Sequence, residues 1–266
     1  MSVPFQKNAY EDIIAVGRTA ASFIREHFQK KDFEEETKDH DNSLVSFVDR
    51  EAEKIITGGL SDLFPDYGFI TEEDTIEQDD RQEYYWIIDP LDGTTNFIHG
   101  LEAFSVSIAL SDRRHELVLG LVIDVMKGDV YYAVKGQGAW KNGKKLILSP
   151  TPLKQSILAT GFPYYRYEKK QEYLKYLAGF MESCRGIRRC GSAALDMVHV
   201  ASGIYGGFFE FDLHIWDVAA GALIVKEAGG LVTDFNQNPE DWKKSGHIVA
   251  GNPLCHREIF QQVNNK

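Results

Sequence analysis

One short segment restricts the possible folds of this chain more than any other. The apolar residues 84–88 predict a buried strand, and Asp89 follows them directly. Pro90 then forces a turn, and Asp92 projects from the chain two residues later. Two carboxylates three residues apart across such a turn can converge on one point, and the main-chain carbonyl of Leu91 between them can turn the same way. Oxygen-only ligands at this density suit a hard cation such as Mg²⁺.

The next residues, Gly93-Thr94-Thr95, can open a helix whose first main-chain N–H groups offer a cradle for a phosphate. One structural explanation competes with the cation site: Asp92 could cap that helix in an Asx-type turn. A threonine could also serve as an ordinary N-cap, which is compatible with the phosphate cradle. The cation site is favoured because Asp89 ends an apolar strand, where an unpaired carboxylate is costly. A cation site beside a phosphate cradle is what phosphoryl chemistry requires.

Composition argues against several classes of function. The 266 residues contain 29 Lys and Arg against 40 Asp and Glu, and the net charge of −11 argues against a nucleic-acid partner. The most apolar stretch, Leu117–Val125, is interrupted by Asp124 and is too short to span a bilayer. Three cysteines without a C-x-x-C motif, and no visible signal sequence in residues 1–14, predict a cytoplasmic protein with reduced thiols and no membrane partner.

Hydrophobic periodicity predicts helices mixed with strands. Helices are expected at about 4–30, 45–64, 168–183, 192–202 and 217–228, and strands at 68–71, 84–89, 106–110, 117–125, 130–134 and 231–234. A polar loop is expected at 31–43, and Asn142-Gly143 predicts a hairpin turn. Because strands and helices do not alternate strictly, the pattern favours a layered α+β fold over a doubly wound parallel sheet.

Four motifs together resemble the inositol monophosphatase family, in its bacterial type. Residues 89–97, Asp-Pro-Leu-Asp-Gly-Thr-Thr-Asn-Phe, are similar to the first signature of that family, and Trp216–Gly221 with Glu227–Gly230 to its second. Phe69–Asp74 is similar to its upstream glutamate motif, and Gly191–Ala194 to its G-[ST]-A-A element. The motifs follow one another in family order across nearly the whole chain.

This resemblance implies a five-layered αβαβα sandwich and a homodimer. It also implies Mg²⁺-dependent, lithium-sensitive hydrolysis of a phosphate monoester, with two or three Mg²⁺ ions per subunit. By motif position, the first ion would be held by Glu72, Asp89 and the Leu91 carbonyl. The second would be held by Asp89, Asp92 and Asp217, and the third, weaker one by Glu72 and waters.

The resemblance also assigns residues to catalysis and to substrate binding. Thr94, paired with Asp49, would orient and deprotonate the attacking water, with Glu72 assisting. The positions expected to contact substrate are Asp92, Gly93, Thr94, Thr95, Gly191, Ser192, Ala193, Glu210 and Asp217. For Glu210, an exposed position on a strand is the alternative, and Asp212 could contribute in its place.

Further positions lie close to these motifs. Lys38 aligns with a family lysine in the loop before the second helix, and Glu73 belongs to the glutamate motif. Arg188 and Arg189, with Arg185, could contact a second phosphate, brace a dimer or lie on a solvated surface. Other residues near the motifs are interpreted as structural or as packing residues: His99, His214, Tyr164, Tyr165 and Tyr167.

We therefore expect a single catalytic domain over residues 1–266. Two lobes are expected to meet near Ser149–Pro152, with the metal and phosphate motifs in about 1–150 and the substrate side and Asp217 in about 151–266. The expected activity is hydrolysis of a small phosphorylated metabolite, with inositol monophosphate as first choice. NADP (at its 2′-phosphate), fructose 1,6-bisphosphate and 3′-phosphoadenosine nucleotides stay open, because all present the same phosphate. A Mg²⁺-binding regulatory protein on the same scaffold is the non-enzymatic alternative.

Overall fold

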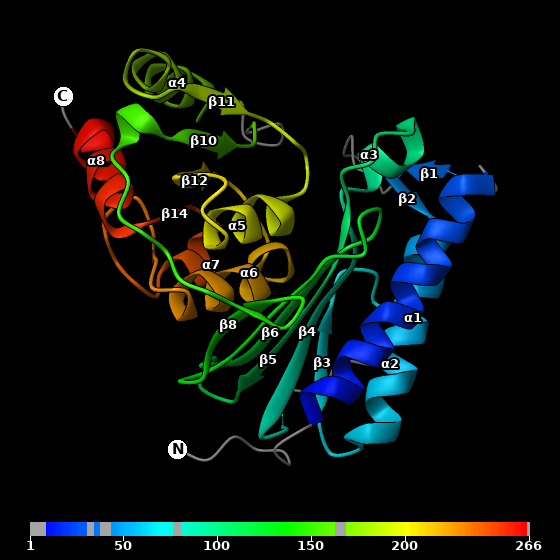
Figure 1. Cartoon of the computed structure of the whole chain (residues 1–266). Coiled ribbons are helices and arrows are strands. Elements are labelled where there is room, and N and C mark those ends of the chain that lie inside the picture. Colours follow the sequence, from blue (N-terminus) through cyan, green and yellow to red (C-terminus); the bar gives the residue numbers. More distant parts are fainter. Residues whose placement is uncertain (1–8, 31–34, 38–43, 77–80, 163–168, 265–266) are drawn as a thin grey trace.

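The computed structural model describes residues 9–30, 35–37, 44–76, 81–162 and 169–264 (Figure 1). In the first part of the chain the elements are α1 (Ala9–Lys30), β1 (Glu35–Thr37), β2 (Leu44–Ser46), α2 (Phe47–Leu63), β3 (Gly68–Thr71), β4 (Tyr84–Asp92), α3 (Thr94–His99), β5 (Ser105–Asp112), β6 (Leu117–Asp124), β7 (Val130–Val134), β8 (Gly138–Lys141) and β9 (Lys144–Leu146). They are followed by η1 (Leu153–Gln155), β10 (Ile157–Thr160), α4 (Lys170–Ser183), β11 (Gly186–Arg188), α5 (Ala193–Ala201), β12 (Gly207–Glu210), α6 (Ile215–Glu227), β13 (Leu231–Thr233), α7 (Trp242–Ser245), β14 (Ile248–Gly251) and α8 (Pro253–Asn264).

Two large sheets organise the molecule. The first has seven strands in the order β3-β4-β5-β6-β7-β8-β9, antiparallel except for the parallel pair β3 and β4. The second has five strands in the order β11-β10-β12-β14-β13 and mixes parallel and antiparallel pairs. The division of the chain into two lobes near Ser149–Pro152 stays a prediction.

The helices form three layers around these sheets, so the expected five-layered αβαβα sandwich is confirmed (Figure 1). Helices α1 and α2 cover the outer face of the seven-stranded sheet. Helices α5 and α6 lie between the two sheets, and α4 and α8 cover the outer face of the five-stranded sheet. Among the described residues, no helix has the length and apolar character needed to cross a bilayer.

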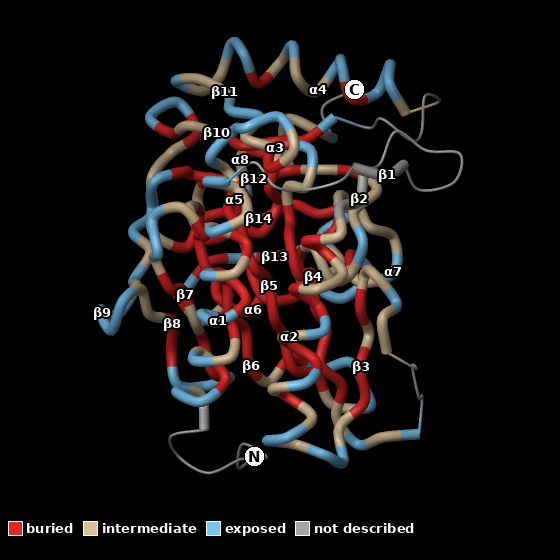
Figure 2. The backbone as a smooth tube through the Cα atoms, turned by 90° about the vertical axis from the view of Figure 1, so that its right-hand side faces the viewer, coloured by how far each residue is buried: buried red, intermediate tan, exposed pale blue. Residues whose placement is uncertain are grey.

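The apolar patterns of the sequence fill the interfaces between these layers. Ile13, Ala20 and Ile24, one stripe of α1, are fully buried against the first sheet. Strand β4 is buried on both faces: Trp86 belongs to the core under α1 and α2, whereas Ile87 belongs to the core under α5 and α6. Figure 2 shows this burial running along the central strands. A strand that is buried on both faces has a continuous run of apolar residues in its sequence, and residues 84–88 of β4 form such a run.

The sequence predicted the strongly periodic elements well and their ends less well. The expected polar loop 31–43 contains a strand, β1, which pairs with β2. The second helix begins at Phe47 rather than at residue 45, because residues 44–46 form β2. Strand β4 does not end at Asp89 but continues to Asp92. The hairpin turn at Asn142-Gly143 is confirmed, with φ of 49° and 76° at its two residues.

A glycine permits the closest approach between the first sheet and the middle helical layer. A methyl group built on Gly120 of β6 would lie 2.5 Å from the Ala220 carbonyl oxygen of α6. That oxygen belongs to a helix backbone and cannot turn aside. Gly120 therefore sets the distance between α6 and the sheet, and with it the position of the α6 N-terminus.

We expect Gly120→Ala to destabilise the protein by about 1–3 kcal/mol or more, because the added methyl forces α6 away from the sheet. Thermal or denaturant unfolding measures the change. The control is Gly58→Ala on the exposed face of α2, where nothing lies within 4 Å of the new methyl. This substitution should stabilise the helix by about 0.5–1 kcal/mol. Equal effects of the two substitutions would contradict the close-approach argument.

Candidate active site

The two aspartates of the central motif are brought to one side of the sheet by a β-bulge. On β5, Ser107 pairs with Asp89 and Ser105 pairs with Asp92, so three steps along β4 match two steps along β5. Residues two apart on a strand face the same side, whereas residues three apart ordinarily face opposite sides. The extra residue of the bulge therefore lets both carboxylates point to the same face.

Asp92 is bound by the N-terminus of α5. Its Oδ2 accepts hydrogen bonds from Ser192 Oγ at 2.5 Å and from the Ala194 amide at 2.8 Å. Burial raises the pKa of Asp92 to about 6, although these hydrogen bonds act in the opposite direction. The Asx-cap explanation is wrong for this residue, as is the threonine N-cap. The N-cap of α3 is Gly93, with a φ of 102° and no side-chain cap.

Asp89, Asp92, Asp217 and Glu72 form what we call the acidic cluster. Asp89 is 1% exposed, and burial raises its pKa well above the usual range, with further increases from Glu72, Asp92 and Asp217. The pKa of Asp217 is raised by burial and by Glu72 and Asp92. Like charges in a buried place repel one another, so a cation would stabilise the cluster strongly.

The carboxylates are not arranged around one point in the protein alone. Within the described ranges, no three His, Cys, Asp or Glu side chains are gathered so that they could hold a metal ion. Hydrogen bonds explain this, because Asp92 is turned toward α5 and Asp217 accepts the main-chain N–H of His214 at 2.7 Å. The donor set still fits a hard divalent cation, since it consists of oxygen atoms and its buried charges lack balance.

A hydroxyl group and a buried carboxylate lie beside the cluster. The Thr94 hydroxyl is 2.8 Å from Asp49 Oδ1 and 3.1 Å from the Leu91 carbonyl oxygen, and Asp49 is 1% exposed on α2. The pairing of Thr94 with Asp49 expected from the resemblance is therefore present. A hydroxyl held in this way can accept a proton from water as it passes its own to the carboxylate.

The residue that fixes the Glu72 loop is not predicted from the sequence. Glu53, one turn after Asp49 on α2, is fully buried. Its two oxygens accept the main-chain N–H groups of Glu73 and Thr75, each at 2.8 Å. Because Glu53 lies in the charged run Asp49–Lys54 of an amphipathic helix, it looks like a surface residue. Only its spacing of four from Asp49 places it on the same face.

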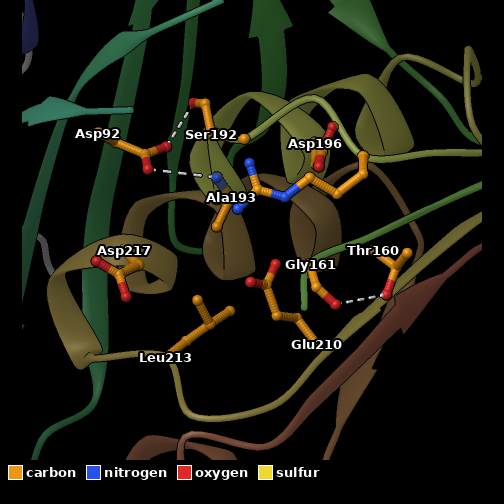
Figure 3. A pocket seen from close by; sticks show the side chains of 11 residues that line it. Asp92, Thr160, Gly161, Ser192, Ala193, Asp196, Glu210, Leu213 and Asp217 are labelled. Carbon is orange, nitrogen blue, oxygen red and sulfur yellow. Dashed lines mark hydrogen bonds between the residues drawn. The ribbon is translucent and has the colours of Figure 1, made fainter. Parts of the chain in front are cut away.

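A cavity of about 130 Å³ opens beside Asp92 and Asp217 (Figure 3). Its lining comes from the loops and strand ends around α5: Asp92, Thr160, Gly161, Arg189, Gly191, Ser192, Ala193, Asp196, Glu210, Leu213 and Asp217. Seven of these were singled out from the sequence. Asp196 was missed, although an aspartate inside the apolar stretch 193–198 is a recognisable signal.

The remaining predicted positions separate into two groups. Glu210 lines the cavity, whereas Asp212 does not and has its Oδ1 3.8 Å from His247 Nδ1. Arg185, Arg188 and Arg189 are all exposed, and of the three Arg189 alone also lines the cavity. Positions that do not line it are Asp49, Glu72, Glu73, Asp89, Leu91, Gly93, Thr94, Thr95, His99 and His214. Lys38 and the tyrosines at 164, 165 and 167 lie outside the described residues.

Comparison with known proteins gives one consistent result. The chain matches the model of the inositol monophosphatase family over residues 6–266. The Nus factor SuhB of Escherichia coli strain K12 is 40% identical over 254 residues, which are 95% of this chain and 94% of that protein. The extragenic suppressor protein suhB of Bartonella henselae has a similar structure, with a TM-score of 0.91 and 33% identity over 97% of this chain and 99% of that one. An IMPase of Thermotoga maritima has a similar structure too, with a TM-score of 0.86 and 33% identity over 97% of each chain. The chain belongs to the inositol monophosphatase family.

Proposed function

We propose that this protein is a Mg²⁺-dependent phosphatase that hydrolyses small phosphate monoesters by direct attack of water. The observation that supports this most is the acidic cluster, in which burial and the neighbouring carboxyl groups raise the pKa of Asp89 and of Asp217 beside a cavity. Glu72, Asp89, the Leu91 carbonyl, Asp92 and Asp217 are the groups that would hold the cations. A divalent cation there supplies positive charge that offsets the charge of the phosphate and of the attacking oxygen.

The side chains beside the cluster supply the proton transfer. The Thr94 hydroxyl orients the attacking water and accepts its proton while passing its own to Asp49, 2.8 Å away. The main-chain N–H groups of Gly93 and Thr94 hold the phosphate oxygens. Gly93 is required there because its φ of 102° is strained for any other residue, and a methyl group would lie 2.9 Å from the Ala103 carbonyl oxygen.

The cavity receives the leaving group of the substrate. Asp196, Glu210 and Arg189 line it beside the aspartates that would hold the cations, and these side chains offer hydrogen-bond partners to the hydroxyls of a leaving group. Inositol monophosphate is therefore our first choice, ahead of NADP, fructose 1,6-bisphosphate and 3′-phosphoadenosine nucleotides. Phosphate release from these four compounds, with and without Mg²⁺, tests the proposal. No release from any of them in Mg²⁺ would reject it.

A second candidate is a regulatory protein on the same scaffold, since the Escherichia coli relative bears the name Nus factor. Retention of the whole acidic cluster and of the Thr94–Asp49 pair supports the enzyme instead. Growth of cells that carry only the Asp89→Asn variant distinguishes the enzymatic role from the regulatory role. Normal growth of those cells, where loss of the protein impairs growth, would favour a role without turnover.

We expect Asp89→Asn to lower kcat by about 100-fold or more, because it removes a cation ligand. Without divalent cations the same variant should unfold at the wild-type temperature or above it, since repulsion within the cluster falls. Mg²⁺ should raise the wild-type Tm more than that of the variant. Asp62→Asn on the exposed side of α2 is the matched control and should resemble wild type in all three measurements. Wild-type kcat in Asp89→Asn at saturating Mg²⁺ would contradict the cation assignment.

Thr94→Ala should lower kcat by about 10²–10⁴-fold with little change in KM, because it removes the group that orients and deprotonates water. Thr94→Ser keeps the hydroxyl and should recover most of the activity. Thr19→Ala, at an exposed threonine of α1 outside the site, serves as the control. If Thr94→Ala instead raises KM and leaves kcat unchanged, Thr94 contributes to phosphate binding alone.

A further inference from the structure

Gly161 and Glu210 lie side by side where two parallel strands end. Strand β10 pairs with β12 in parallel, with Thr160 opposite Phe209, so the next residues along the two strands are Gly161 and Glu210. Residues opposite each other on paired strands direct their side chains to the same face of a sheet. A side chain at position 161 would therefore enter the space beside Glu210. Both residues line the cavity next to the acidic cluster (Figure 3).

The carboxyl group of Glu210 lies directly over Gly161. A methyl group built on Gly161 would overlap with the carboxyl carbon and with both carboxyl oxygens of Glu210, and these are the three atoms nearest to it. Gly161 itself is buried. The Glu210 carboxyl group therefore occupies the place that any other residue at position 161 would fill with its own side chain.

The main chain at Gly161 does not by itself require a glycine. Its φ lies outside the left-handed region in which glycine is favoured. The neighbouring Thr160 fixes this segment, because its hydroxyl donates to the Gly161 carbonyl oxygen at 3.1 Å and lies 3.2 Å from the Tyr173 hydroxyl of α4. What glycine supplies at this position is room for the Glu210 side chain.

This room keeps a hydrogen-bonding group at the wall of the cavity. Burial raises the pKa of Glu210 to about 8; Asp196 adds to the increase, and Arg189 opposes it. A protonated carboxyl group can donate a hydrogen bond to a hydroxyl and can also accept one. If the group turned away from Gly161 and into the cavity, it would take up space that a leaving group needs.

We propose that Gly161 determines which leaving groups the cavity accepts, because its bare Cα lets the Glu210 carboxyl group lie against the cavity wall. This inference rests on the proposed function and names the basis of its substrate choice. Gly161 thus acts as a positioning residue, through Glu210. A cyclic leaving group with several hydroxyls fills more of the cavity than a short chain does, so it depends more on this arrangement.

Gly161→Ala should displace the Glu210 carboxyl group and leave the fold intact. The new methyl meets the flexible end of a side chain, whereas the methyl of Gly120→Ala meets a backbone oxygen. Thermal unfolding should therefore show a smaller loss of stability for Gly161→Ala than for Gly120→Ala. The value of kcat/KM for inositol monophosphate should fall by about tenfold or more, mainly through KM, because Glu210 faces the leaving group.

The experiment divides kcat/KM for inositol monophosphate by kcat/KM for glycerol 2-phosphate, both in Mg²⁺. If wild type hydrolyses another of the four compounds named above better, that compound takes the place of inositol monophosphate. The ratio does not depend on the fraction of active enzyme, so partial misfolding of a variant does not affect it. Gly161→Ala should lower the ratio. Gly58→Ala makes the same substitution at an exposed position on α2 and should leave it unchanged.

The double variant Gly161→Ala/Glu210→Ala tests whether the effect passes through Glu210. Glu210→Ala alone should lower the ratio, and adding Gly161→Ala should lower it no further, because no carboxyl group is left to displace. An unchanged ratio in Gly161→Ala, or a second fall of the same size in the double variant, would overturn the inference. A Gly161→Ala chain that does not fold would also overturn it, because the methyl would then meet more than a flexible side chain.

Failure of this inference is distinct from failure of the proposed function. If wild type releases phosphate from none of the four compounds, the proposed function itself fails. If it hydrolyses one of them and the ratio does not respond to Gly161→Ala, only the role of Gly161 fails.

Discussion

The repulsion among four carboxyl groups, two of which are buried, is the constraint on which this structure depends. Asp89 and Asp92 come from the bulge of β4, Asp217 from the N-terminus of α6, and Glu72 from the residue after β3. Each takes part in a main-chain hydrogen bond or a strand pairing, and the four come from different segments, so the cost of their proximity is spread over several layers. The bulge, the close approach of α6 at Gly120 and the N-terminus of α5 all serve the placement of one charged cluster.

The N-termini of two helices reduce the repulsion within the acidic cluster when no cation is bound. The positive end of a helix stabilises a carboxylate, and both α5 and α6 point this end at the cluster. Asp92 and Asp217 are therefore partly satisfied by amide groups in the protein alone. These interactions also turn the Asp92 and Asp217 side chains away from a common point. The described carboxylates therefore influence one another electrostatically without forming a complete metal site.

Much of the fold and part of the site followed from the sequence. The stripe of α1 and the apolar run of β4 were predicted because burial on one face or two leaves a clear pattern. The bulge left no pattern, since one extra residue between Asp89 and Asp92 does not change the apolar run before it. Most short strands of the second sheet are not predicted, because three or four residues are too few to show a clear alternation of apolar and polar side chains. The arginines at 185–189 are neighbours in sequence, but only Arg189 lines the cavity, a difference that depends on how β11 ends.

Two acidic residues of α2 link this helix to the site. Asp49 accepts a hydrogen bond from the Thr94 hydroxyl and Glu53 fixes the loop that carries Glu72, so one helix positions two parts of the site that lie on α3 and after β3. A rigid displacement of α2 along the sheet would move both parts together. The contact that resists such sliding lies at the other end of the helix, where a methyl group on Gly59 would come within 2.9 Å of Val16 on α1. A change in the packing of this outermost layer of the sandwich would therefore shift Thr94 and the Glu72 loop together.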